Sequence, residues 1–271
     1  MTARLLAQAG VRDSLRTYWF WLNAGVFVVG GLLLMLFGQV DVTVLGYRSY
    51  GRALAGLMQL ALFVVPLMAL LSAGAAISGA RETGALDYLL AQPVTRGEVF
   101  AGKWLGVTTA VVVSLAVGYG VTGAVAAVKG VPAPPIALLL VFTSILAAAF
   151  VSIGLWVSAL ASTRGRATSV VLTLWLAFLS LGSLGLMAAF VRWGFPSSVL
   201  EVWSLLNPIE AFRLAMISLL EADPGLLGPA GAALLGRLGR AGLIVTASGS
   251  LVAWTAFAYW AGRRAFASAS S

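Results

Sequence analysis

The sequence predicts an all-α membrane protein with six transmembrane helices. Hydrophobic residues make up 61% of the 271 residues and charged residues only 10%, and the mean hydropathy of +0.99 lies far above the range of soluble domains. Six charge-free stretches each reach the roughly 20 residues that a helix needs to cross a bilayer core of about 30 Å. These stretches are 17–40, 53–80, 104–128, 130–163, 167–191 and 241–262.

The distribution of basic residues predicts a multi-pass protein of the cell membrane with both termini in the cytoplasm. Most arginines and lysines fall on the side of the N-terminus, whereas the short outer loops carry only Arg48, Arg52 and Lys129, as the positive-inside rule requires. Residues 1–16 interleave leucine and valine with arginine, which favours an interfacial helix on the cytoplasmic face; a polar leader that only supplies charge is the alternative. The net charge of +8 is thereby explained without a nucleic-acid partner.

Between the second and third stretches, residues 79–106 are predicted to form two helices at the cytoplasmic surface. Pro93 ends the first helix, because the residue before a proline avoids the α conformation. Thr95 and Glu98 have the spacing of a capping box for the second helix, which continues into the third stretch. Such a pair of helices is a rigid lever for a soluble partner. The apolar residues at helical spacing in the first helix, and hence its expected docking face, are Leu86, Leu89 and Leu90.

Residues 192–240 form an outer loop that is long enough to contain helices of its own. Ser198 and Glu201 have the spacing of one capping box, and Glu210 and Arg213 are close enough on a helix to pair. These helices either dip into the outer leaflet and roof the membrane domain, or form a folded cap without contact to substrate. A second helix start combines a capping residue, a proline in the first position and an acid in the first turn: Asn207, Pro208 and Glu210.

Missing residue types exclude most kinds of catalysis. The chain has no cysteine and no histidine, so it offers no thiol nucleophile, imidazole base or Cys–His metal site. The six charge-free stretches contain no ionisable carboxylate or amine, which argues against an ion-coupled secondary carrier or channel. That class remains the alternative function, and an intramembrane enzyme is less supported still, because every acid lies in a loop.

The segment 79–106 resembles the cytoplasmic loop of ABC-2-type transporter permeases. That loop follows the pattern Glu-x-Glu-x-Gly-Thr-Leu, a leucine-rich stretch, Pro-Val or Pro-Ile, a basic residue and Gly-Lys. Ala80 and Ala85 depart from it, standing where the family often has an acid and a threonine, so a salt bridge made by that acid is in doubt here. The matching positions are Glu82, Gly84, Leu86, Leu89, Leu90, Pro93, Val94, Arg96, Gly102 and Lys103.

The resemblance implies the permease subunit of an ATP-driven exporter, which pairs with a second permease copy as a homodimer. It also implies that cytoplasmic ABC ATPase subunits bind ATP and Mg²⁺, whereas this chain holds no cofactor or metal. The residues expected to contact the ATPase are Arg81, Glu82, Leu86, Leu89, Leu90, Pro93 and Arg96.

One outer segment is similar to a subgroup of that family. Ser204–Arg213 (SLLNPIEAFR) resembles the outer loop of the permease that helps to mature nitrous oxide reductase. This similarity implies a role in maturing a copper/sulfur site and a soluble outer partner. The transported substrate is left open among a sulfur species, a lipid and a drug-like compound.

Overall fold

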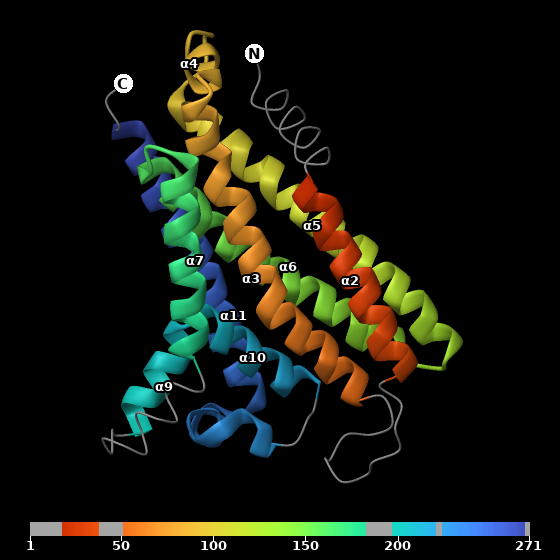
Figure 1. The fold of residues 1–271 in the computed structure, drawn as a ribbon. Helices are drawn as coiled ribbons and strands as arrows, with labels where there is room; N and C mark the ends of the chain where they lie inside the picture. Colours follow the sequence, from red (N-terminus) through yellow and green to blue (C-terminus); the bar gives the residue numbers. More distant parts are fainter. Residues whose placement is uncertain (1–17, 38–50, 183–196, 221–223, 269–271) are drawn as a thin grey trace.

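The computed structural model describes residues 18–37, 51–182, 197–220 and 224–268, and within these ranges the regular structure is entirely helical (Figure 1). Five helices are long and apolar enough to cross a membrane. They are α2 (Tyr18–Phe37), α3 (Gly51–Glu82), α5 (Arg96–Val128), α6 (Ala133–Leu160) and α11 (Gly228–Ser268). The all-α prediction and five of the six predicted spans are thereby confirmed.

The remaining span is described only in part. Helix α7 (Arg164–Ser180) begins the fifth charge-free stretch and is 17 residues long; the described chain stops at residue 182. The second half of this predicted span, and the predicted interfacial helix at 1–16, lie outside the described residues. A sixth complete span therefore stays a prediction.

Helix α6 is the centre of the bundle. It packs along α3 and α11 and also contacts α5, while α2 packs on α5 and α7 on α3. The approach of α6 to α3 depends on Gly154: a Cβ at this position would lie 2.8 Å from the Cβ of Ala73 and 3.0 Å from the carbonyl oxygen of Leu70. Because lipid tails are as apolar as the helix side chains, close van der Waals packing of this kind, rather than hydrophobic burial, holds helices together in a bilayer.

The short helices divide between the two ends of the bundle (Figure 1). Helix α4 (Ala85–Leu90) lies at one end, here called the loop end, together with the C-terminal end of α11. Helices α9 (Ser197–Leu206) and α10 (Pro208–Leu219) and the 3-10 helix η2 (Pro224–Leu227) lie at the other, here called the cap end. Helix α11 begins at the cap end and bends at Gly239, whose φ of 67° interrupts the helix.

Helix α10 is built into the bundle. All of its residues except Arg213 and Leu219 are buried, and it packs against α11, α6, α3 and α9. Its predicted start is confirmed: the Asn207 side chain accepts the N–H of Ile209 at 3.0 Å and donates to the carbonyl oxygen of Phe178 at 2.8 Å. This packing attaches α10 to the membrane helices, and both arrangements expected for the outer loop stay predictions.

The start of α9 corrects one expectation. Ser198 and Glu201 do not form a capping box, because α9 already begins at Ser197 and Ser198 lies inside it. Glu201 is buried and pairs with Arg237 of α11 at 3.1 Å instead. A spacing of three residues suits both a capping box and the interior of a helix, so the local pattern could not distinguish them.

The packing of α2 on α5 generates a prediction about two glycines of the same helix. A Cβ at Gly118 would lie 2.4 Å from the Cβ of Phe27, whereas a Cβ at Gly120 would meet nothing within 4 Å. Because the backbone fixes the Cβ of Phe27, Gly118→Ala must push the helices apart, and we expect a cost of about 1–3 kcal/mol. Gly120→Ala is the matched control. Thermal unfolding of the purified protein should show a lower Tm for the first variant alone; equal Tm values would contradict this packing.

Candidate functional site

The candidate site is the loop end, where the chain turns from α3 through α4 into α5. Helix α3 ends at Glu82, and Gly84 follows with a φ of 72°, a left-handed conformation that glycine adopts without strain. Helix α4 begins directly after it and ends before the turn at Pro93. The two helices predicted for residues 79–106 are thus present, as α4 and as the beginning of α5, while their cytoplasmic location stays a prediction.

The capping box at the start of α5 is confirmed. The Thr95 hydroxyl accepts the backbone N–H of Glu98 at 3.3 Å, and the Glu98 carboxylate accepts the backbone N–H of Thr95 at 2.8 Å. From this box α5 runs for 33 residues to Val128 without interruption, a length of about 50 Å. The second helix of the loop and the third membrane span are therefore one rod.

The leucine face of α4 points into the chain's own structure. Leu86 is buried, Leu90 packs against the same hydrophobic core and Leu89 is half-buried. The expectation that these leucines form the docking face is corrected for Leu86, which a partner cannot reach. The exposed residues of α4 and of the turn after it are instead Ala85, Asp87, Tyr88, Ala91 and Pro93, and the Tyr88 side chain is 74% exposed.

Arg81 binds the end of α6. Its guanidinium donates to the carbonyl oxygens of Ala161 and Ala159, the second at 3.2 Å. Carbonyl groups at the end of a helix have no partner within the helix, and a cation is favourable there. One turn earlier in α3, the backbone N–H groups of Ile77 and Ser78 donate to the Ser158 hydroxyl at 3.0 and 2.9 Å. The loop ends of α3 and α6 are thus held together.

Glu82 binds the start of α7. Its carboxylate accepts the backbone N–H of Arg164, the first residue of α7, at 2.8 Å. Thr163 caps the same helix by accepting the N–H of Arg166 at 3.3 Å. The N-terminal end of a helix carries a partial positive charge, so an acid is favourable there, just as a cation is favourable at the partially negative C-terminal end. Arg81 and Glu82 together therefore fix both sides of the α6–α7 turn to the end of α3.

This double contact is the feature that sequence reasoning missed. Arg81 and Glu82 were expected to face an ATPase partner, whereas the structure engages both with the α6–α7 turn of their own chain. The two segments lie about 80 residues apart, and no local pattern indicates such a contact. The one available signal was the presence of adjacent opposite charges at the very end of a membrane helix.

The first turn of α5 also contacts the end of α11. The Arg96 guanidinium donates to the carbonyl oxygen of Phe266 at 3.4 Å, and the guanidinium of Arg263 lies against Gly97, 3.1 Å from where a Cβ would be. Arg96, which was expected to contact the ATPase, thus also binds a residue of its own chain. As a result α3, α5, α6, α7 and α11 are connected at the loop end.

The predicted outer residues hold the cap end together. Arg213 pairs with the buried carboxylate of Glu210 at 2.7 Å and donates to the carbonyl oxygen of Leu226 at 2.8 Å. With the Asn207 cap and Pro208 in the first helical position, all four residues stabilise α10 and its connection to α11. These four residues therefore stabilise the fold of the cap end.

The residue types at both ends suit mechanical coupling. Helix-end contacts, a capping box and buried ion pairs position helices relative to one another. Deeper in the bundle, the described polar contacts between spans involve neutral groups, such as Asn23 with Ser114 at 2.8 Å and Tyr119 with Thr143 at 3.0 Å. Such contacts join helices without introducing charge into the membrane.

Comparison with known proteins agrees with this architecture. A relative from Pseudomonas aeruginosa, named "Probable ABC transporter permease protein NosY", is 32% identical over 266 residues, which cover 95% of this chain and 92% of the relative. A relative of the same name from Stutzerimonas stutzeri is 28% identical over 231 residues, covering 82% of this chain and 84% of the relative.

The family model described as "ABC-2 family transporter protein" matches residues 5–270. The resemblance first seen in segment 79–106 therefore extends over nearly the whole chain. Membership of this family indicates a transmembrane subunit of an ABC transporter and implies ABC ATPase partners. The chain belongs to the ABC-2 family, as a multi-pass membrane permease of an ABC transporter.

Proposed function

We propose that this permease is the membrane part of an ATP-driven exporter and that separate ATPase subunits drive it by pushing on the loop end. The observation that carries the proposal is the unbroken course of α5 from the capping box at Thr95 to Val128. The sequence has no Gly-x-x-x-x-Gly-Lys-Ser/Thr phosphate loop, which supports the binding of ATP and Mg²⁺ in the partner.

In this proposal a push on α4 reaches the membrane by two routes. The first is the rod of α5, which has no flexible joint after its capping box. The second is the contact of Arg81 and Glu82 with the α6–α7 turn, which transmits movement of α3 to α6 and α7. The two cytoplasmic turns would therefore move together, and four spans would respond to one contact.

The exposed side of α4 is the proposed contact surface for the ATPase. Tyr88 projects from it and is flanked by Asp87, Ala91 and Pro93, all of them exposed. Exposed aromatic side chains are frequent energetic anchors of protein interfaces. In this arrangement Leu86 and Leu90 hold α4 on the bundle, so that force on Tyr88 is transmitted to α3 and α5.

Further proposals follow from the family and the subgroup. The similarity to ABC-2 permeases supports pairing with a second copy as a homodimer. The similarity of segment 204–213 to the subgroup's outer loop, together with the name NosY of both relatives, supports a role in maturing nitrous oxide reductase. The cap end, on the far side from α4 (Figure 1), would then face a soluble outer partner.

The proposed function is tested by purifying the tagged permease from its native host. We expect an ABC ATPase to copurify and the reconstituted complex to move its substrate only when ATP is hydrolysed. The permease alone should hydrolyse no ATP. Transport by the permease alone, driven by an ion gradient, would contradict the proposal and would support the alternative class of ion-coupled carriers.

The docking surface is tested by comparing Tyr88 with Leu86. Tyr88→Ala removes an exposed side chain, so the permease should still fold, while its affinity for the ATPase falls by about 30-fold, as expected when an interface anchor is lost. Leu86→Asp should instead lower the yield of folded protein, because it buries an unpaired carboxylate. The measurements are ATPase copurification and the yield of monodisperse permease. An unchanged affinity of the Tyr88 variant would reject this surface.

The contact between Glu82 and α7 is tested at its donor. Arg164→Pro removes the N–H that Glu82 accepts, and proline is tolerated in the first position of a helix; Thr163 before it is already extended, with φ −132° and ψ 156°. Arg164→Ala keeps the N–H and is the control. Because the bond is exposed, we expect Arg164→Pro and Glu82→Ala each to lower transport per ATP by roughly two- to fivefold.

The variant that combines Glu82→Ala with Arg164→Pro shows whether the two substitutions act through the same bond or independently. If the bond between Glu82 and Arg164 is responsible, the combined variant should be no worse than either single variant. Additive losses, or an equal loss in Arg164→Ala, would show that the bond does not transmit force.

The proposed orientation is tested with single cysteines, since the chain has none of its own. Gly165→Cys lies at the loop end, where an added Cβ meets nothing within 4 Å, and Val128→Cys lies at the opposite end of α5, where the side chain is 89% exposed. In intact cells a membrane-impermeant maleimide should label position 128 alone. Labelling of position 165 from outside would reverse the proposed topology.

A further inference from the structure

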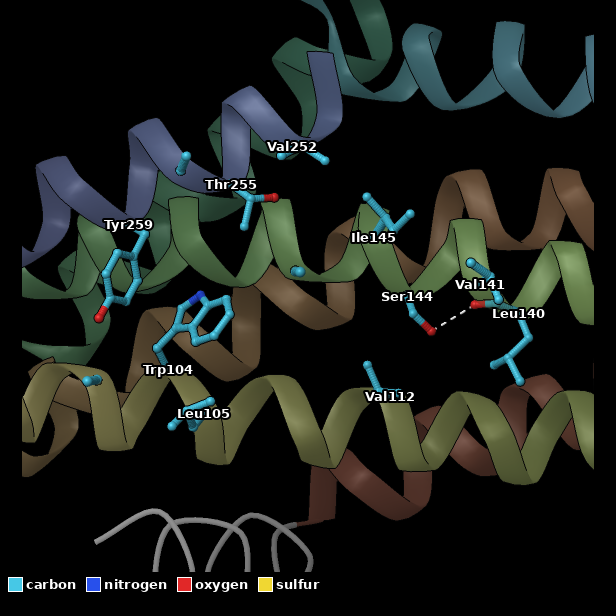
Figure 2. Close-up of a pocket in the computed structure, with 13 residues that line it drawn as sticks. Trp104, Leu105, Val112, Leu140, Val141, Ser144, Ile145, Val252, Thr255 and Tyr259 are labelled. Carbon is cyan, nitrogen blue, oxygen red and sulfur yellow. Dashed lines mark hydrogen bonds between the residues drawn. The ribbon is translucent and has the colours of Figure 1, made fainter. Parts of the chain in front are cut away.

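A groove between α5, α6 and α11 has no role in the coupling described above (Figure 2). Its volume is about 860 Å³, which is large enough for a small molecule. Most of its lining side chains are aliphatic, among them Leu105 and Val112 of α5, Val141 and Ile145 of α6, and Val252 of α11. The groove is open on one side, and Val141 and Val252 are more than half exposed.

The polar side chains along the groove are already engaged. The hydroxyls of Ser144 and Thr255 donate to the carbonyl oxygens of Leu140 and Leu251 in their own helices, at 2.7 and 2.9 Å. The indole N–H of Trp104 donates to the Ser152 hydroxyl at 2.8 Å. The groove therefore favours a ligand whose buried part needs no hydrogen bond. Hydrocarbon meets this requirement, and a peptide or a polar solute does not.

The loop end of the groove has a different chemistry. Trp104 and Tyr259 stand at this end and Leu140 at the other (Figure 2), and the two aromatic rings meet edge to face at 5.3 Å. Arg263 lies four residues after Tyr259, one turn further along α11, and its guanidinium lies against Gly97, one turn before the groove residue Ala101 of α5. The groove thus leads from an aliphatic interior past two amphipathic aromatic rings to a cation. This is the order of environments along a phospholipid, from its acyl chain to its phosphate.

We propose that the groove binds the acyl chains of an anionic phospholipid, with its phosphate at Arg263. The charge argues for an anionic lipid. The ion pairs among the described residues join Arg213 to Glu210 and Arg237 to Glu201, and none of them neutralises Arg263. The lipid bridges α5 and α11, two helices that contact each other much less than each contacts α6. It therefore stabilises the side of the rod that faces away from α3.

Native mass spectrometry of the purified permease tests the proposal with two probes of equal acyl chains, dioleoyl phosphatidylglycerol and dioleoyl phosphatidylethanolamine. We expect one tightly bound phosphatidylglycerol and a weaker phosphatidylethanolamine. Arg263→Gln should lower the affinity for phosphatidylglycerol about fivefold and should lower that for phosphatidylethanolamine less, because the ammonium group of that lipid offsets the charge of its phosphate. Arg166→Gln, which removes an exposed cation of the same end on α7, is the matched control and should change neither.

The groove itself is tested by filling it. Val141→Trp and Leu105→Trp place bulk at two exposed positions on different helices, so at least one variant should fold, and each should lower the binding of both lipids by more than tenfold. Unchanged lipid binding in a folded tryptophan variant would overturn the proposal. So would equal affinity for the two lipids in the unmodified permease, or a change from dimer to monomer on filling the groove, which would show that a second copy occupies it.

Discussion

A helix in a bilayer must satisfy its own backbone hydrogen bonds, because hydrocarbon offers no partner for them. This constraint makes an uninterrupted span a stiff element and leaves the helix ends as the main sites of adjustable contacts. Helix α5 illustrates it: it extends past the length needed to cross the membrane and reaches the loop end without a break. Helix α3 is also long enough, but Pro66 lies inside it and removes one backbone hydrogen bond. In the proposed function, the stiffness of α5 allows a contact at α4 to act on the membrane domain.

Contacts at the helix ends connect the spans to one another, and in the proposed function these contacts decide which spans move together. Arg81 and Glu82, at the end of α3, bind the C-terminal end of α6 and the N-terminal end of α7. At the opposite end, Asn207 joins α10 to α7 through the carbonyl oxygen of Phe178, and the Trp254 indole donates to the carbonyl oxygen of Leu206. Unpaired groups at helix termini thus serve as connection points at both ends of the bundle. The permease thus consists of long helices that are connected by hydrogen bonds at their ends.

The sequence was sufficient for features that depend on neighbouring residues. Charge-free length predicted five described spans, and the Thr95–Glu98 and Asn207–Pro208 helix starts are where local spacing places them. Features that depend on distant residues were not accessible. The apolar spacing of α4 predicted a face but not its partner, and Leu86 turns inward because the end of α3 is beside it. The contact of Glu82 with Arg164 joins segments that only the folded bundle brings together.

The central claim is that the two cytoplasmic turns move as one unit when the ATPase acts. Spin labels at positions 83 and 165, on either side of the Glu82 contact, and at 226 in the cap end report this directly by pulsed electron paramagnetic resonance on the assembled transporter. On trapping the ATP-bound state, the 83–165 distance should stay constant, while the distances from both labels to position 226 change together. A change of the 83–165 distance, with only one of the other two distances following, would show that the turns move independently and would contradict the account.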